Sequence, residues 1–493
     1  MPTLDREFTV GPLSFQLEPG TAFVRAIRFH GHEALRGIYP AVRDEFWGTL
    51  PAGAGPAEAE IAPDLVRLRI TGQLQHTATG LEWEADISAR SDGTLRYHWR
   101  GRARWTFRTN RTGLCVLHPA EAAGAPCRVE HADGRSVSGW LPTAIAPHQP
   151  FTDLRAVAHT FGGGAEAIVR FEGETFEMED QRNWSDASFK TYCRPLARPR
   201  PYEVKAGEVI EHVATLTLRG RPGVETDRAA ALAPIGALPR IGFVLPGPVP
   251  AALRARVAAL KPAHVRVDTA AADLAATLAW AEPEAAALGC DLELAVRGAT
   301  AAAPAKLPPR CVALLFDHEG GAVAGETLAA WRQTGAGAIG TGSRHHFTEL
   351  NRQRPPLDGA HALTTFGLNA QVHAFDDTSM TETVTQHAAL VAHARAIGGG
   401  RAVAVGPITL GPAADSDDPR LHTDFAAHWT RGSLAALARA GAARATYFRT
   451  HGPGGIVREA SATPLEKFFL GLARDPGGFS DAVYVAGRDA IPV

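Results

Sequence analysis

The sequence predicts a multidomain protein in which an antiparallel β-sandwich precedes an α/β domain with the (β/α)8, or TIM-barrel, architecture. Three observations support this. Apolar and polar residues alternate over much of the first half, a Pro- and Gly-rich stretch follows residue 220, and short apolar runs then alternate with Ala-rich helical stretches. We expect the sandwich over residues 1–222 and the barrel over residues 238–475.

Segments of the first half alternate with a period of two, which predicts strands with one face in water. In residues 95–108, Leu95, Tyr97 and Trp99 share one face and arginines occupy the other. The sequence Ser-Asp-Gly at 91–93 predicts a hairpin turn before this strand. Other strands are predicted at 22–29, 65–71, 81–89, 114–117, 166–171 and 208–218.

The second half contains eight strand signals separated mostly by helices. The strands are predicted at 241–245, 263–268, 290–297, 311–317, 337–342, part of 363–375, 402–409 and 445–450. Helices are predicted at 250–260, 271–288, 324–334, 380–396, 423–441 and 463–473. A doubly wound open sheet is the alternative, but no GxGxxG follows the first strand. In residues 476–493, a strand at 482–487 could return to the sandwich.

Composition excludes several classes of protein. With 50 Lys and Arg against 52 Asp and Glu, the net charge is −2, whereas nucleic-acid binders and polybasic membrane-surface proteins need a positive excess. The five cysteines show no CxxC spacing, which favours reduced thiols. No signal peptide or long apolar run is evident, so we expect a cytoplasmic protein that contacts no membrane. The sequence does not predict an oligomeric state.

Candidate site residues follow the predicted barrel strands, because TIM-barrel active sites lie at the carboxyl ends of the strands. The densest group, His345, Glu349, Asn351 and Arg352, follows the fifth strand. The adjacent pair of histidines at 345–346 would point apart and matches no metal motif, so no metal is expected.

The sixth strand is followed by His373 and Asp376. Either residue could be functional. Asp376 or Asp377 could instead only cap the next helix, since Asp-Asp-Thr-Ser is a favourable helix start.

A second dense stretch, residues 177–192, lies in the sandwich half. Glu179, Arg182 and Lys190 alternate there with Trp184 and Tyr192, without a strand or helix period. Rings and charged groups together suit a sugar-sized ligand, because rings stack on it and charged groups bond its hydroxyls. An inter-domain salt-bridge network is the alternative. Residues 36–48 are charged and aromatic in the same way.

The stretch EMEDQRNWSDASFKTYCRPL at 177–196 closely resembles the signature of the bacterial D-apionate lactonase (D-apionolactonase) family. Segments 36–49, 347–355 and 371–377 resemble further parts of it, although Phe46 stands where a polar residue is expected. The resemblance spans nearly the whole chain. It implies a glycoside-hydrolase-like barrel with a β-sandwich, and hydrolysis of a sugar lactone, D-apionolactone, to D-apionate in apiose catabolism.

Opening a lactone with water requires a base, an oxyanion donor and an acid for the leaving alkoxide. We hypothesise that Glu349 or Glu179 is the base and that His345, His373 or Arg352 is the donor and acid. No GxSxG elbow supports a covalent serine route, and no cofactor is implied. The expected substrate-binding residues are Arg182, Asn183, Trp184, Lys190, Tyr192, Asn351, Arg352 and Asp376.

Two other functions stay open at this point. A glycoside hydrolase acting on an apiose-type or related glycoside needs two carboxylates. Glu319 follows the fourth strand, but no carboxylate follows the seventh until Asp415. A non-catalytic carbohydrate-binding protein would bind such ligands without turnover.

Overall fold

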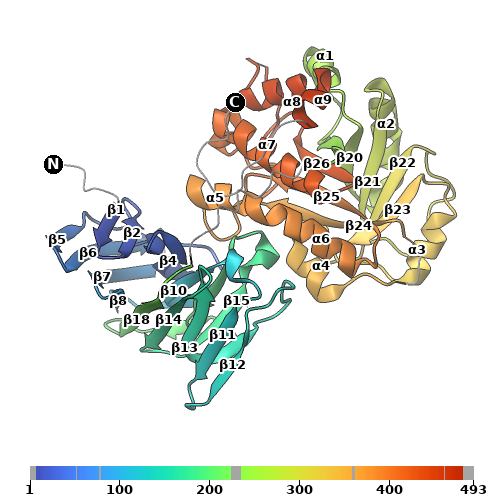
Figure 1. Cartoon of the computed structure of the whole chain (residues 1–493). Coiled ribbons are helices and arrows are strands. Elements are labelled where there is room, and N and C mark those ends of the chain that lie inside the picture. Colours follow the sequence, from blue (N-terminus) through green and yellow to red (C-terminus); the bar gives the residue numbers. More distant parts are fainter. Residues whose placement is uncertain are drawn as a thin grey trace. The chain divides into compact units, whose positions relative to one another are not determined.

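The structure is a computed structural model that describes residues 7–51, 53–76, 79–223, 235–357, 361–459 and 461–480 (Figure 1). The chain forms two compact units. Unit 1 comprises Met1–Gln181 and Ser188–Arg228, and unit 2 comprises Arg182–Ala187 and Ala229–Val493. The short segment Arg182–Ala187 therefore belongs to the barrel unit, although the chain on both sides of it belongs to the sheet unit.

Unit 1 is built on a 16-stranded antiparallel sheet. The main path runs β1-β2-β3-β4-β10-β16-β15-β13-β14-β18-β8-β7-β6-β5, and β11 and β12 attach through β13, while β9 and β17 pair separately. The bounds are β1 (Glu7–Val10), β2 (Leu13–Leu17), β3 (Val24–Phe29), β4 (His32–Arg43), β5 (Glu58–Ala62), β6 (Leu65–His76), β7 (Thr79–Arg90), β8 (Thr94–Ala103), β9 (Phe107–Thr109), β10 (Arg111–Pro119), β11 (Pro126–His131), β12 (Ser136–Trp140), β13 (Phe151–Phe161), β14 (Ala165–Glu172), β15 (Phe176–Asp180), β16 (Ser188–Tyr192), β17 (Tyr202–Val204) and β18 (Val209–Gly220), with short 3-10 turns at Ala120–Ala122 and Gln181–Trp184.

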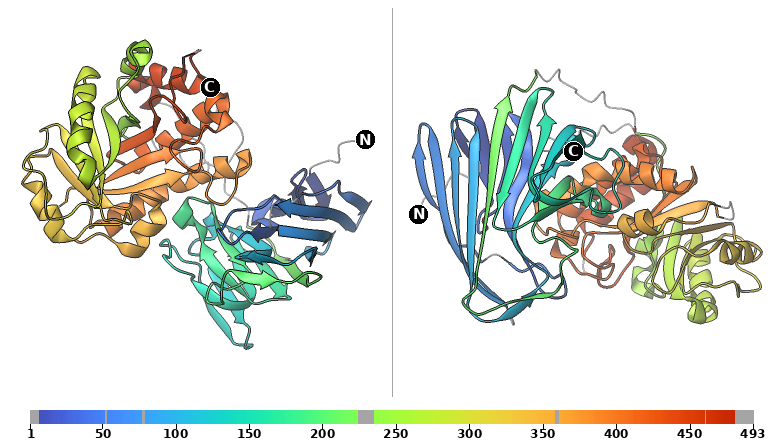
Figure 2. Two further views of the ribbon diagram at one scale, coloured as in Figure 1. Left: turned by 180° about the vertical axis from the view of Figure 1, so that it is seen from behind. Right: turned by 90° about the horizontal axis from the view of Figure 1, so that it is seen from below.

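The sheet doubles back on itself. Strands that are far apart along its path lie close together in space: β4 contacts β14, and β10 contacts β18. One apolar core fills the space between the layers, with Phe15, Trp99 and Phe176 among its buried members. Figure 2 shows the long strands of this unit standing side by side in the view from below. The predicted sandwich is thus present as a single folded sheet.

The predicted strand faces and hairpin are confirmed. Leu95, Tyr97 and Trp99 are fully or almost fully buried. Gly93, at a φ of +87°, ends the turn between β7 and β8, and its N–H donates to the Arg90 carbonyl. The positive φ explains the glycine, because other residues are strained there.

Three segments differ from the sequence prediction. The strand predicted over 95–108 ends at Ala103, and Phe107–Thr109 forms β9. Residues 36–48 showed no period, yet they contain most of β4. Residues 177–192 showed none either, yet they contain most of β15 and all of β16. These three strands lie in the interior of the sheet, and every residue of β16 is buried. A strand covered on both faces carries no alternating pattern, which is why the sequence did not reveal it.

Unit 2 is a closed barrel of parallel strands, so the doubly wound alternative is wrong. Its helices surround the strands in Figure 1. The strands are β19 (Arg240–Val244), β20 (His264–Ala270), β21 (Asp291–Arg297), β22 (Cys311–Phe316), β23 (Ala338–Gly342), β24 (Leu363–Asn369), β25 (Ala402–Thr409) and β26 (Arg444–Arg449). The helices are α1 (Ala251–Ala259), α2 (Leu274–Ala287), α3 (Gly325–Arg332), α4 (Phe347–Gln353), α5 (Asp377–Thr383), α6 (His387–Ile397), α7 (Asp424–Arg439), α8 (Pro464–Arg474) and α9 (Pro476–Ser480), with 3-10 turns at Ala271–Asp273, Val384–Gln386 and Pro419–His422.

Each predicted barrel strand is confirmed to within a few residues, and so are the predicted helices, with the one at 380–396 divided into α5, a 3-10 turn and α6. Helix α4, which contains three of the four candidate residues after the fifth strand, was not among the predicted helices, and no helix lies between β21 and β22. The strand predicted at 482–487 lies outside the described residues. Within the described ranges, no helix has the length and apolar character that spanning a membrane requires.

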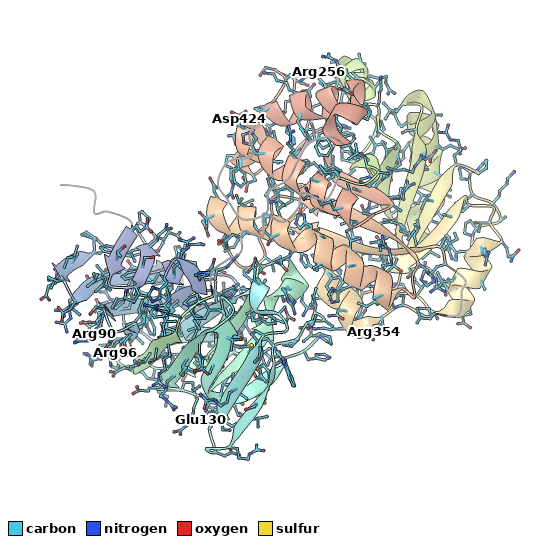
Figure 3. All side chains as sticks on the ribbon, viewed as in Figure 1. Arg90, Arg96, Glu130, Arg256, Arg354 and Asp424 are labelled. Carbon is cyan, nitrogen blue, oxygen red and sulfur yellow. The ribbon has the colours of Figure 1, made fainter. Side chains whose placement is uncertain are left out.

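Ion pairs stabilise the barrel unit both between its outer helices and inside the barrel. On the outside, Arg256 of α1, labelled in Figure 3, donates from Nε and Nη2 to the Glu466 carboxylate of α8 at 2.9 and 2.5 Å. Inside the barrel, the buried Glu293 carboxylate accepts from Arg444 Nε at 2.8 Å and from Thr446 Oγ1 at 3.1 Å. Burial raises the pKa of Glu293, but His264 and Arg444 outweigh this and hold it below its usual range. The network joins three strands through one carboxylate.

Buried histidines make the fold sensitive to acid. Burial lowers the pKa of His159 to about 4, that of His264 to about 4 and that of His387 to about 3. In the unfolded chain these histidines have pKa values of about 6.5, so below that pH the unfolded chain binds more protons than the folded chain does. We therefore expect the free energy of unfolding to fall as pH drops from about 6.5 toward 4.

Urea denaturation at pH 7.5, 6.0 and 5.0 checks this prediction. His159→Gln should reduce the loss between pH 7.5 and 5.0, whereas replacing His98, which lies near the surface beside Glu211, should not. Equal stability of the wild-type protein at pH 7.5 and pH 5.0 would contradict the prediction.

Candidate active site

The carboxyl end of the barrel receives the segment Arg182–Ala187, which belongs to unit 2 and contributes an acidic partner to a barrel histidine. Asp186 Oδ2 lies 2.7 Å from Nδ1 of His373, which follows β24. Both side chains are mostly buried, with exposed fractions of 18% for Asp186 and 15% for His373. A carboxylate on Nδ1 keeps the proton there, so the lone pair of the imidazole lies on Nε2.

Trp184 lies between this pair and the residues that follow β23. Its ring meets His373 edge-on, at 5.7 Å between centroids, and meets His346 at 5.5 Å. The Arg352 guanidinium of α4 lies 5.9 Å from the same ring. One indole thus contacts residues from two of the barrel's loops and fixes their relative positions.

Hydrogen bonds hold the segment in place. Asn351 Nδ2 donates to Asn183 Oδ1 at 2.9 Å, and Ser185 Oγ donates to the Asn369 carbonyl at 3.2 Å. Asn369 ends β24, and its side-chain oxygen accepts from the N–H of Gln371 at 2.6 Å. Because these polar groups are buried and bonded, the segment is a fixed part of the barrel end.

Two arginines meet one carboxylate at the ends of β20 and β23. Asp268 accepts from Arg266 Nε at 3.2 Å and from Arg344 Nε at 3.2 Å. Arg266 is fully buried and also donates to the Gly406 carbonyl, whereas Arg344 is 35% exposed. Burial opposes ionisation of Asp268, but the two arginines hold its pKa below the usual range. Arg344 is thereby a fixed, partly accessible cation.

Glu349 lies at the start of α4. Its Oε2 accepts from the N–H of His346 at 2.9 Å, as a carboxylate does when it reaches back to cap a helix. Burial raises the pKa of Glu349 and lowers that of His346 to about 4. One oxygen of the predicted base is therefore engaged in holding the helix start.

The other predicted residues of the barrel, His345 and Asp376, make hydrogen bonds to backbone groups. His345 is exposed, and its Nε2 lies 3.1 Å from the Glu319 carbonyl oxygen. Asp376 is the N-cap of α5 and accepts from the N–H of Ser379 at 2.8 Å, which is the capping role that the sequence left open. Asp377 contacts Arg420 at 3.0 Å.

The other predicted residues lie in unit 1. Glu179 of β15 faces Lys190 of β16 in register, and their charged atoms are 3.2 Å apart. Tyr192 donates to Glu177 at 2.6 Å. The structure therefore divides the predicted residues into a group at the barrel end and a group on the central strands of the sheet.

Sequence reasoning assigned no role to Asp186, Asp268 or Arg344. Asp186 lies inside the stretch singled out at 177–192, Asp268 lies in the second half of β20 and Arg344 follows β23, so each carried a positional signal. What the sequence lacked was the pairing of Asp186 with His373, 187 positions along the chain. Among the described residues, no group of three His, Cys, Asp or Glu side chains is arranged to hold a metal ion.

The barrel end therefore combines an imidazole oriented by a carboxylate, fixed guanidinium groups and an indole. An oriented imidazole can accept and return a proton. Guanidinium groups stabilise negative charge that develops on oxygen, and the indole offers an apolar surface. The imidazole and the guanidinium groups can thus supply the proton transfer and the oxyanion stabilisation that ester or lactone hydrolysis by water requires.

Comparison with known proteins identifies the family. Residues 2–221 match the N-terminal domain of D-apionate lactonase, and residues 323–477 match its TIM-barrel domain. The D-apionate lactonase of Brucella anthropi is 32% identical over 443 residues, covering 81% of this chain and 72% of that protein.

Solved structures give only weak likenesses. The α-galactosidase from Lactobacillus brevis has a TM-score of 0.30 at 9% identity, over 96% of this chain and 83% of that chain. Galactose 1-epimerase from Lactobacillus acidophilus has a TM-score of 0.28 at 8% identity, over 43% of this chain and 93% of that chain. Nothing about the site follows from likenesses this weak. On the two domain matches and the Brucella relative, the chain belongs to the D-apionate lactonase family and is, by that membership, a lactonase.

Proposed function

We propose that this protein hydrolyses D-apionolactone to D-apionate at the carboxyl end of its barrel, with His373 as the general base. The observation that carries the proposal is the 2.7 Å contact between His373 Nδ1 and Asp186 Oδ2. It orients the ring and stabilises the imidazolium that forms when Nε2 takes a proton.

The reaction proceeds by direct attack of water. His373 Nε2 removes a proton from water as its oxygen adds to the lactone carbonyl, which gives a tetrahedral oxyanion. Arg352, held against Trp184 as His373 is, stabilises this charge. The ring C–O bond then breaks, and the imidazolium returns its proton to the leaving alkoxide, so that one water is consumed and one hydroxy acid is formed.

Arg344, Asn183 and Asn351 are the further candidates for binding the lactone hydroxyls. Arg344 is supported by its exposure and by the fixed position that Asp268 gives it. Asn183 lies in the segment that carries Asp186 and accepts a hydrogen bond from Asn351 of α4. Asp376 is assigned the capping of α5 instead.

Glu349 is the alternative base, since burial raises its pKa toward the range in which a carboxylate accepts protons efficiently. Its engagement with the His346 N–H argues for a structural role. The two assignments separate by experiment. With His373 as the base, Glu349→Gln should retain most of kcat and lower thermal stability, because a capping contact is worth about 0.5–2 kcal/mol. A kcat loss in Glu349→Gln that matches the His373→Gln loss would favour Glu349.

Acid release at constant pH from a panel of sugar lactones tests the proposal. We expect catalysed release from D-apionolactone that exceeds the spontaneous rate and is unaffected by EDTA. Asp186→Asn serves as the matched blank, because it keeps the fold and the side-chain size. No catalysed acid release from any lactone of the panel would contradict the proposal. Turnover of apiose-containing glycosides instead would favour a glycoside hydrolase.

A further inference from the structure

Unit 1 contains two buried arginines that face each other without a carboxylate between them. Arg111 of β10 and Arg43 of β4 are register partners on neighbouring antiparallel strands, so their side chains lie on the same face of the sheet. Arg111 is 5% exposed and Arg43 is 8% exposed. Like charges directly opposite each other destabilise a sheet, and burial adds to that cost.

Neither arginine is directly paired with a carboxylate among the described residues. Burial opposes the charge of Arg111, but Cys115, Tyr192 and Glu179 outweigh it and hold the pKa of Arg111 above its usual range. Within the part of the chain that the structure describes, the Arg111 guanidinium forms no hydrogen bond or ion pair, and its Nε is fully buried. It stacks on the Tyr192 ring at 3.7 Å and lies 5.6 Å from the Trp47 ring. Arg43 donates to the Trp47 carbonyl at 3.0 Å, a neutral partner.

A third cation lies on the same face. Lys190 of β16 is 1% exposed, and its Nζ is 3.2 Å from Glu179 and 5.4 Å from the Tyr192 ring. The carboxylate of Glu177 is already engaged by the Tyr192 hydroxyl and the Leu196 N–H. Burial lowers the pKa of Lys190, and Arg111 and Arg43 lower it further, while Glu179 opposes them. The face is therefore electropositive beside one ring that is buried and one, Trp47, that is partly exposed.

We propose that this face of unit 1 is a binding site for the carboxylate of a small sugar acid, with Arg111 and Arg43 as the anion ligands. A planar guanidinium pairs with a carboxylate through two parallel hydrogen bonds, which the unengaged Arg111 group can supply. Glu179 and Lys190 are placed to bond hydroxyls, and Trp47 offers an apolar surface. The choice of a sugar acid rests on the proposed function, whose product carries such a carboxylate.

Titration of the full-length protein with D-apionate tests the proposal, with Trp47 fluorescence as the local reporter. The fluorescence change assigned to the site is the part of the quenching that disappears when Trp47 is replaced by Phe. All titrations use the Asp186→Asn protein, in which turnover is suppressed. We expect saturable quenching and a loss of affinity of roughly 10- to 100-fold in Arg111→Met, as for a lost charged hydrogen bond. Arg108→Met is the matched control, because Arg108 is 57% exposed and lies 3.7 Å from Glu45.

A second measurement separates ligand binding from a structural role. Because an unpaired buried guanidinium destabilises the empty protein, Arg111→Met should leave the melting temperature unchanged or raise it. Unchanged D-apionate affinity in Arg111→Met, or a lowered melting temperature with binding intact, would overturn the proposal. Inorganic phosphate that binds as tightly as D-apionate would overturn the assignment to a sugar acid. The titration reads binding without turnover, so failure of the lactonase proposal and failure of this one are distinguishable.

Discussion

Replacing His373 by Gln is expected to lower kcat for D-apionolactone by roughly 10²- to 10⁴-fold, because removal of a general base has an effect of this size. Glutamine preserves much of the volume beside Trp184, and so the fold should persist. The loss should appear in kcat more than in KM, since the base acts in the transition state. Initial rates across a range of lactone concentrations, corrected for spontaneous hydrolysis, measure both constants.

Asp186→Asn should produce a comparable loss through a different cause. An amide cannot hold the Nδ1 proton as a carboxylate does, and the resulting change of tautomer costs up to roughly 10⁴-fold in a comparable triad. The double variant should be little worse than either single one, because the two residues act as a unit. His428→Gln is the control, since His428 is exposed on helix α7. Near-normal turnover in either variant would exclude the Asp186–His373 pair as the base.

The second large effect is on stability. Glu293→Ala is expected to lower the free energy of unfolding by about 3–5 kcal/mol, because removing one partner of a buried ion pair leaves the other charge uncompensated. The uncompensated charge is Arg444, which lies 7% exposed inside the barrel, 2.8 Å from the Glu293 carboxylate. The loss of the Thr446 hydrogen bond adds to it.

Denaturant unfolding monitored by far-ultraviolet circular dichroism measures this loss for the barrel. Glu326→Ala is the matched control, because Glu326 is exposed in the first turn of α3, where substitutions usually change stability by less than about 0.5 kcal/mol. A double variant, Glu293→Ala with Arg444→Met, should recover part of the loss by removing the isolated charge. A Glu293→Ala protein as stable as the control would show that the network contributes little.

Local pattern alone determined much of this fold. Alternation over 95–103 predicted a strand with one face in water. The spacing of apolar runs after residue 240 predicted the eight barrel strands to within a few residues of their ends. These predictions succeeded because, in a half-buried strand or an amphipathic helix, apolar residues recur in the sequence with the period of that structure. The position of candidate residues after strands also followed, because a TIM barrel gathers its strand ends at one rim.

The tertiary structure decided what depends on contacts between distant residues. The strands β4, β15 and β16 carry no period because they are covered on both faces, so only their pairing defines them. The same holds for the assignment of Arg182–Ala187 to the barrel, which brings Asp186 to His373. The opposition of Arg43 and Arg111 likewise arises from strand register. Sequence order encodes local periodicity, whereas partners far apart in the chain meet only when the chain folds, and chemistry depends on those partners.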